Sequence, residues 1–400
     1  MTTMRILVAC THQNLVGGIE TYLHDLLPAL RARGHAVGLL TSFAAVPERP
    51  RVAGPELPVW SLDRGGWAGV SGEVEAWRPD VVFLHGLDAP ADEEALVERY
   101  PTALFAHGHN GTCVSGTRTH AFPTHRPCGR RFGPACLALY FPRRCGGLNP
   151  VTMTRLYLIQ KRRAGLVPRY AAVIVGSRYL ADEYRDHGVP AERLHRVPLF
   201  PTGQAPDPAP PRRPRTDRVL MVGRLYKEKG AHLLAEAVAR AAARLGRALT
   251  LVVAGEGPER AAMQARAARL NLPAEFHGWV GPERRAELMR GADLLAVPSV
   301  CPETFGLVGV EAGCLGLPAA GFAVCGVPDW LVAGESGELA PGDPPTAAAL
   351  ADALWRALAD PDHLRRLSAG AWRTARTFSR EAHVAAVEAV LARTAGVPGA

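Results

Sequence analysis

Short apolar runs alternate with amphipathic stretches in the first half of the chain. Residues 5–10 are apolar enough for a buried strand, and the Gly17-Gly18 turn and a helical pattern that stops at Gly34 follow. Further apolar runs predict buried strands at 36–42, 81–85 and 103–106, with helical patterns such as 92–100 between them. This alternation favours a parallel sheet that helices cover on both faces.

The same pattern continues around an irregular, cysteine-bearing stretch at 107–150. After it we expect helices at 152–164 and 178–187 and strands at 172–176 and 194–199. Residues 201–216 then hold six prolines and almost nothing apolar. Such a composition cannot form a core, so it predicts a linker between domains.

The second half repeats the alternation of strand and helix. Its predicted strands are 218–222, 249–254, 294–298 and 319–324, and its predicted helices are 230–245, 258–270 and 306–315. The predicted fold class is therefore α/β, with two doubly wound Rossmann-like domains. A cleft between two such domains would lie at the carboxyl ends of their strands, where ligands of these sheets bind.

A chain of 400 residues is long enough for two domains of similar size. We assign residues 1–200 to the first domain and 217–378 to the second, with a last helix at 380–395 that packs back on the first. The amino terminus lacks the pattern of a signal peptide, and no apolar run approaches the roughly 20 residues that span a bilayer. We therefore expect a cytoplasmic protein, with any peripheral membrane contact at the inner face of the membrane.

The net charge of +8 is unevenly distributed. Residues 99–181 contain thirteen Arg and Lys and no Asp or Glu, which leaves the other residues at 8 − 13, or −5. A solvated face normally mixes both signs, so this stretch favours an anionic partner.

Two glutamates give the strongest local signal. Glu303 lies just before a predicted helix and Glu311 two turns into it, so both fall near the same helix face. The amides of 304–307 between them would be helix N-terminal donors suited to a diphosphate or a sugar hydroxyl. Ordinary helix chemistry also explains such a pair.

A second candidate is the loop from Gly223 to Gly230, which connects a strand to a helix. Arg224 and Lys229 could both approach a diphosphate there. The chain has three lysines against forty-three arginines, and two of the lysines lie in this loop. A compact ammonium group is therefore favoured at this place.

Two weaker signals come from the first half. Gly17-Gly18 permits close approach of a phosphate to the following helix, although a plain turn has the same sequence. His107 follows a predicted strand and would face the cleft, where a histidine is either structural or in contact with substrate.

Taken together, these residues resemble family 4 of the retaining glycosyltransferases, which have the GT-B fold. The resemblance extends over nearly the whole chain, in order: Gly17-Gly18-Ile-Glu20, His107, Gly223-Arg224 with Lys229, His277-Gly278-Trp279-Val280, Glu303 with Glu311, Gly326-Val-Pro-Asp329 and Phe378-Ser379-Arg380. One departure is Cys325-Gly326, where the family often has two glycines.

The resemblance implies a role for each matched residue. The implied catalytic group is His107, Arg224, Lys229 and Glu303, with His107 near the reacting face of the sugar and the two cations on the donor diphosphate. Glu311 would bind ribose hydroxyls. The other implied donor-binding residues are Gly17, Gly18, Trp279, Val280, Thr304, Phe305, Gly306 and Leu307.

The implied reaction transfers a hexose from a UDP- or GDP-linked sugar to an acceptor hydroxyl, with retention and without a metal cofactor. The acid-free basic stretch of the first domain, residues 99–181, indicates an anionic or lipid-linked saccharide acceptor, as in the synthesis of cell-envelope polysaccharide or glycolipid. Alternatives from other classes are a GT-B epimerase or phosphorylase, and a non-catalytic protein that binds sugar nucleotides or nucleic acid. The last would leave the Arg, Lys and Glu set without a role, so nucleic acid is not the expected partner.

Four cysteines lie within the irregular stretch: Cys113, Cys128, Cys136 and Cys145. A structural zinc ion held by four thiolates would stabilise such a segment. Their spacing lacks the paired CxxC of common zinc sites, so disulfides and free thiols stay open as alternatives.

Overall fold

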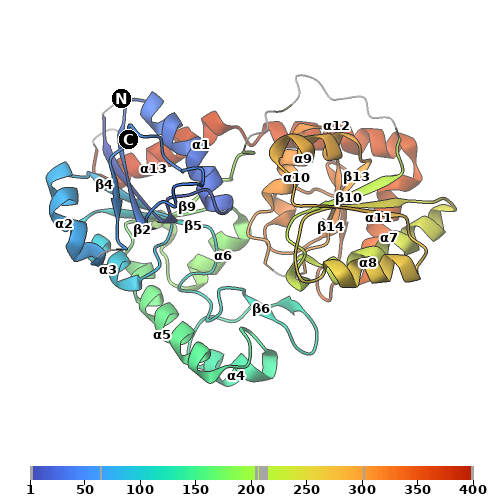
Figure 1. The fold of residues 1–400 in the computed structure, drawn as a ribbon, viewed down its shortest axis with the longest axis horizontal. Helices are drawn as coiled ribbons and strands as arrows, with labels where there is room; N and C mark the ends of the chain where they lie inside the picture. Colours follow the sequence, from blue (N-terminus) through green and yellow to red (C-terminus); the bar gives the residue numbers. More distant parts are fainter. Residues whose placement is uncertain (1–2, 64, 203–205, 207–214, 301, 398–400) are drawn as a thin grey trace.

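The computed structural model describes residues 3–63, 65–202, 206, 215–300 and 302–397. Two parallel sheets, each between layers of helices, lie side by side (Figure 1). The two-sheet α/β architecture predicted from the apolar runs is confirmed. Most of the predicted linker, residues 203–205 and 207–214, lies outside the described residues.

The first sheet has seven parallel strands in the order β3-β2-β1-β4-β5-β8-β9. In chain order the strands are β1 (Arg5–His12), β2 (Ala36–Phe43), β3 (Val59–Ser61), β4 (Val81–Leu84), β5 (Thr102–Ala106), β8 (Ala172–Val175) and β9 (Leu194–Arg196). Their central residues are almost all buried, as expected for strands that are covered on both faces.

The second sheet has six parallel strands in the order β12-β11-β10-β13-β14-β15. They are β10 (Arg218–Val222), β11 (Thr250–Ala254), β12 (Ala274–Gly278), β13 (Leu294–Val297), β14 (Ala319–Phe322) and β15 (Gly337–Ala340). The chain builds outward from β10 in one direction and then, from β13, in the other. The boundary between β10 and β13 is therefore a topological switch point, where sheets of this kind bind ligands.

Helices cover both sheets. Around the first lie α1 (Gly18–Ala32), α2 (Gly66–Trp77), α3 (Pro90–Arg99), α5 (Pro150–Leu166) and α6 (Arg178–Asp186), with short 3-10 turns at Val167–Arg169 and Ala191–Arg193. Around the second lie α7 (Ala231–Leu245), α8 (Arg260–Arg269), α9 (Pro282–Arg290), α10 (Leu307–Cys314), α11 (Ala347–Ala359) and α12 (Pro361–Arg376), with 3-10 turns at Lys227–Lys229 and Val327–Asp329.

The last helix, α13 (Arg380–Thr394), returns to the first sheet (Figure 1). Its Val387 and Leu391 are fully buried in the core formed by α1 and the first sheet. Glu388 accepts a hydrogen bond from Arg33 at 2.5 Å and lies 2.9 Å from His35 Nε2. The carboxyl-terminal helix therefore belongs to the first core, and the chain crosses between the two halves twice.

The cysteine-bearing stretch is more ordered than its composition indicates. It contains a short hairpin of β6 (Thr119–His120) and β7 (Arg126–Pro127) and the helix α4 (Ala135–Arg143). Figure 1 shows α4 and α5 extending away from the first sheet, with the hairpin near the second half. The rings of His125 and His232 of α7 lie 6.1 Å apart, so this stretch also reaches the second half.

Candidate active site

A cavity of about 650 Å³ lies between the two halves of the molecule. Gly18 and Thr21 of α1 line it from the first half, and the ends of β10 and β13 line it from the second. It therefore opens at the topological switch point of the second sheet, at the carboxyl ends of the strands. Of the predicted site residues, Gly18, Arg224, Lys229, Trp279, Val280, Glu303, Gly306, Leu307 and Glu311 line this cavity.

The loop that carries the predicted cations is held close to the neighbouring strand by a glycine. Gly230 has a φ of 70°, and a Cβ at this position would lie 1.8 Å from the carbonyl oxygen of Pro298, just after β13. Only glycine permits this approach. Because of it, Lys229 lies beside the residues that follow β13.

Lys229 and Glu303 form an ion pair across the cavity. Ser299 Oγ donates a second hydrogen bond to the same carboxylate oxygen at 3.3 Å. Arg224 lies at the end of β10 on the same cavity, with its guanidinium 5.6 Å from the ring centre of Tyr226. Two cations from one loop and one carboxylate before α10 therefore face a common space.

Glu311 is buried in the wall of this cavity, on α10. Thr202 Oγ1 donates to its Oε1 at 3.3 Å, and Arg285 of α9 lies 3.4 Å from its Oε2. Burial raises the pKa of Glu311, although the Arg285 charge and the Thr202 hydrogen bond oppose this shift. Glu303 and Glu311 thus line the same cavity, as their spacing around the start of a helix predicts.

Trp279 and Val280 follow β12 and line one end of the cavity. The Trp279 side chain is 80% exposed, which is unusual for so large an apolar group. An exposed indole in a cavity wall offers a flat surface on which an aromatic base can stack.

Four of the residues predicted for the catalytic and donor site do not line this cavity: Gly17, Thr304, Phe305 and His107. Gly17 is the N-cap of α1, next to Gly18. Thr304 and Phe305 precede α10, but Phe305 is in the second core, where its carbonyl accepts from Trp330 Nε1 at 2.6 Å. The start of α10 instead faces the cavity through Gly306 and Leu307.

His107 lines a separate cavity of about 180 Å³ in the first half. Its Nε2 is 2.8 Å from His85 Nδ1, and its ring stacks on Phe105 at 4.6 Å. Burial, with a smaller contribution from His383, lowers the pKa of His107 to about 3. His107 is therefore a neutral imidazole at physiological pH.

The sequence did not identify several residues that line the main cavity. His24 and Asp25 of α1, Thr202, Arg285 and Ser299 all do so. Sequence analysis missed Arg285 because α9 has the composition of a polar surface helix. Only the fold brings this arginine next to Glu311.

Outside both cavities, Cys325 has a φ of 51°, in the left-handed region that favours glycine. This conformation explains why a glycine is common at the position where the sequence departs from the family. The next residue, Gly326, packs against the backbone, since a Cβ there would lie 2.3 Å from the carbonyl oxygen of Thr304. The loop thus keeps its close contact with the segment before α10 despite the substitution.

The four clustered cysteines come together around one small cavity, which His120 and Arg118 also line. All four are free thiols. Among the described residues, no group of three or more His, Cys, Asp or Glu side chains is arranged to hold a metal ion. The predicted zinc site is therefore without support, although the four cysteines do line the same cavity.

The fold and the cavity together define a GT-B glycosyltransferase: two Rossmann-like halves with a cavity between them that both cations and carboxylates line. Two family models match consecutive parts of the chain, Glycosyltransferase Family 4 at residues 16–200 and Glycosyl transferases group 1 at residues 207–373. These matches span most of the chain, which belongs to the family 4-type glycosyltransferases.

Named relatives agree with this assignment. The chain is 27% identical over 418 residues to a glycogen synthase of Mycobacterium tuberculosis, with 93% of this chain and 92% of the relative covered. It is also 27% identical over 367 residues to a phosphatidyl-myo-inositol mannosyltransferase of the same species, with 88% and 86% covered.

Solved structures share the fold. The Anabaena protein HepE in complex with UDP superposes with a TM-score of 0.68 at 17% identity, over 98% of this chain and all of that one. Sucrose-phosphate synthase from Thermosynechococcus elongatus gives a TM-score of 0.65 at 21% identity, over 98% of each chain. Within the described residues, no helix is both long and apolar enough to cross a bilayer.

Proposed function

We propose that this glycosyltransferase moves a hexose from a UDP- or GDP-linked sugar to an acceptor hydroxyl, with retention of the anomeric configuration and without a metal cofactor. The observation that carries the proposal is the shared cavity, where Arg224, Lys229, Glu303 and Glu311 converge with the start of α10. A relative of known structure that binds UDP has the same fold.

The cations that line the cavity would bind the donor diphosphate. Arg224 and Lys229 lie on one loop, and Arg285 approaches from α9, so positive charge lines the cavity from two elements. Fixed cations stabilise the negative charge that develops on a departing nucleoside diphosphate, which is the task a divalent ion performs in other enzymes. The start of α10 adds oriented amides on the same side.

The two carboxylates would accept hydrogen bonds from the hydroxyl groups of the donor. Glu311 is buried beside Thr202 and Arg285, in a position to accept hydrogen bonds from ribose hydroxyls. Glu303, in the segment before α10, would bind the transferred sugar, and Trp279 with Val280 would contact the base. Gly17 and Gly18, at the start of α1, would abut the phosphates, with Thr304 and Phe305 supporting the helix start.

In the proposed reaction the acceptor oxygen forms the new bond to the anomeric carbon as the bond to the diphosphate oxygen breaks. Attack comes from the face that the diphosphate leaves, and the departing phosphate oxygen takes the acceptor's proton. His107, neutral in its ring cluster, would hydrogen-bond to the sugar rather than supply charge.

The proposed acceptor is a saccharide that is anionic or lipid-linked, as in cell-envelope polysaccharide or glycolipid synthesis. Two observations support this class: the acid-free basic stretch at 99–181 in the first half, and the relative named as a phosphatidyl-myo-inositol mannosyltransferase. The proposed place of action is the cytoplasm, with any peripheral membrane contact at the inner face of the membrane.

A panel of nucleotide sugars scored by thermal shift tests the donor, since a ligand that binds only the native state raises the apparent stability. We expect UDP- or GDP-sugars to raise the Tm, and transfer from the best donor to continue in excess EDTA. NMR of the product should show the donor's anomeric configuration. An inverted product, or activity lost to EDTA and restored by a divalent cation, would refute the proposed mechanism.

A further inference from the structure

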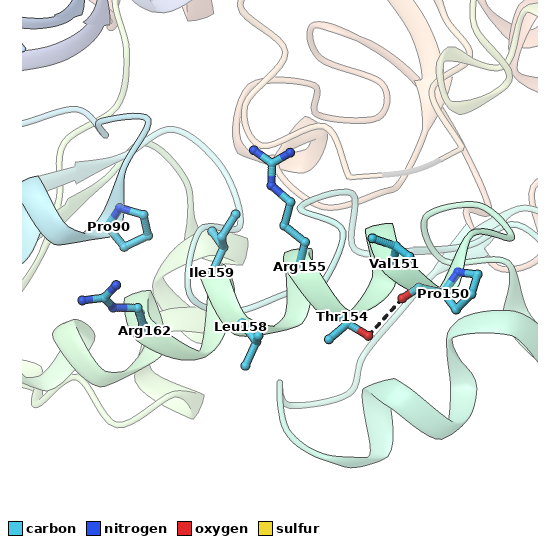
Figure 2. A pocket seen from close by; sticks show the side chains of 8 residues that line it. All are labelled: Pro90, Pro150, Val151, Thr154, Arg155, Leu158, Ile159 and Arg162. Carbon is cyan, nitrogen blue, oxygen red and sulfur yellow. Dashed lines mark hydrogen bonds between the residues drawn. The ribbon is translucent and has the colours of Figure 1, made fainter. Parts of the chain in front are cut away.

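Helix α5 carries an exposed face that mixes aliphatic and basic side chains. Val151, Arg155, Leu158 and Arg162 follow one another at intervals of four, three and four residues, so they share one face. Val151 is 75% exposed and Leu158 55%. Figure 2 shows these four side chains along the exposed length of the helix.

The orientation of this face is fixed by the other side of the helix. Arg163 lies buried, with its Nε 3.2 Å from Glu93 Oε2 of α3, and Gln160 accepts from the backbone N–H of Gly111 at 2.6 Å. Leu166 is buried in the core on the face of the first sheet opposite α13. Since the helix is anchored by these contacts, the aliphatic groups opposite them remain at the surface.

The exposed face extends into the preceding loop. Leu148, two residues before α5, is 66% exposed. Beside α5 runs an open groove of about 700 Å³, between Pro90 of α3 and the residues from Pro150 to Arg162. The face therefore continues over more than three turns of helix, with no element of the described chain packed on its aliphatic groups.

Positive charge on this face is poorly compensated. Arg162 pairs with Glu94 at 2.7 Å, but Arg155 and Lys161 form no ion pair with any carboxylate in the described part of the chain. The whole stretch from 99 to 181 contains no acidic residue. A surface that combines negative charge with an apolar layer would complement both kinds of side chain on this face.

We propose that the face formed by Leu148, Val151, Arg155 and Leu158, with Lys161 at its edge three residues after Leu158, docks on the surface of an anionic lipid bilayer. The arginine and lysine groups would reach the lipid phosphates while Leu148, Val151 and Leu158 enter the boundary of the acyl chains. Single aliphatic groups spaced between cations fit a fluid interface better than the continuous apolar patch of a protein contact.

Docking through α5 would bring the first half of the molecule to the membrane. His107 and its cavity belong to that half, so an acceptor carried on a lipid would meet the enzyme on its proposed acceptor side. This consequence rests on the proposed function, whereas the docking itself does not.

The test uses the full chain with phosphatidylcholine vesicles that contain or lack phosphatidylglycerol, and no donor. We expect the protein to sediment with the anionic vesicles only, and added salt to release it because salt screens surface charge. The variant Arg155→Glu with Leu158→Asp should bind at least about tenfold more weakly, given about 1 kcal/mol per basic residue near such a surface. Val151→Asp, at the first turn of α5, should weaken binding independently.

Arg269→Glu with Leu270→Asp is the matched control, since both residues are exposed on the second half, far from α5 in the chain. It should bind vesicles as the wild type does. A Tm equal to that of the wild type confirms that each variant folds, and a shift of that Tm by UDP or GDP reports on the donor site separately. Equal binding to neutral vesicles, no loss in the α5 variants, or a wild-type dimer that these variants dissociate would overturn the proposal.

Discussion

The ammonium group of Lys229 and the carboxylate of Glu303 form an ion pair although 73 residues separate them in the chain. The ion pair links the loop after β10 to the segment before α10. Each group is the nearest opposite charge of the other, so a donor diphosphate and its sugar would bind at the point where the two meet.

Lys229→Ala should therefore reduce transfer by roughly 100-fold or more, the usual effect of removing one group that stabilises developing charge. The fold should survive, because a partly exposed ion pair contributes only about 0–1 kcal/mol. Initial rates and the Tm measure the two effects. Lys227→Ala is the control, since Lys227 is on the same 3-10 turn and does not line the cavity. Equal rates for the two variants would remove Lys229 from the mechanism.

Glu311→Gln should separate binding from stability. The amide should weaken nucleotide binding about tenfold or more, because a hydrogen bond to a charged acceptor is lost. Burial raises the pKa of Glu311 in the folded protein, so its carboxylate lowers stability at neutral pH, and this cost disappears as the pH falls through the raised pKa towards 4.5.

The variant should accordingly unfold at higher urea concentration than the wild type at pH 7, with a difference that narrows under mildly acidic conditions. Urea unfolding at several pH values, alongside nucleotide titration, measures both. A variant that is less stable than the wild type at neutral pH would show that the attraction between Arg285 and the Glu311 carboxylate exceeds the desolvation cost of burying that carboxylate.

The sequence predicted the strands well where they are fully buried, because a parallel strand covered on both faces is a continuous apolar run. Short or weakly apolar elements were missed, such as β3 (Val59–Ser61) and α2, whose segment contains three glycines. The predicted strand at 194–199 ends earlier, at Arg196. Its last residues instead lead into the crossing to the second half.

The site was predictable to the extent that it lies at strand ends and at one helix start. Arg224, Lys229, Glu303 and Glu311 are local features of that kind, and they do line one cavity. The surroundings of His107 were not predictable, because α13 brings His383 beside it from the far end of the chain. Contacts between distant segments leave no periodic signal in the sequence.

Cys136 and Cys145, two of the four cysteines around the cavity in the irregular stretch, should be protonated thiols at neutral pH. Burial, followed by the neighbouring thiols of Cys128, Cys113 and Cys136, raises the pKa of Cys145 to about 11, and burial also raises the pKa of Cys136. In protein purified under reducing conditions, we expect slow native alkylation and eight reactive thiols after unfolding. Stoichiometric zinc in metal analysis would contradict this prediction.

The histidine cluster around Tyr22 should make the protein sensitive to acid. Tyr22 Oη lies 2.8 Å from His383 Nε2, and His85 and His107 are 2.8 Å apart in the same cluster. Burial lowers the pKa of His107 to about 3 and that of His383 to about 4, and it also lowers the pKa of His85.

Because these pKa values are depressed, the unfolded chain takes up protons near pH 6.5 while the folded protein does not. The stability that the neutral rings contribute is therefore complete above pH 6.5 and is lost progressively down to about pH 4. His383→Gln removes one of these groups, so its free energy of unfolding should depend less steeply on pH between 6.5 and 4, by up to about 1.4 kcal/mol per pH unit. Urea unfolding across this range measures the slope. His12→Gln, outside the cluster, should keep the wild-type slope, and an unchanged slope in His383→Gln would show that His383 takes up its proton in the folded protein.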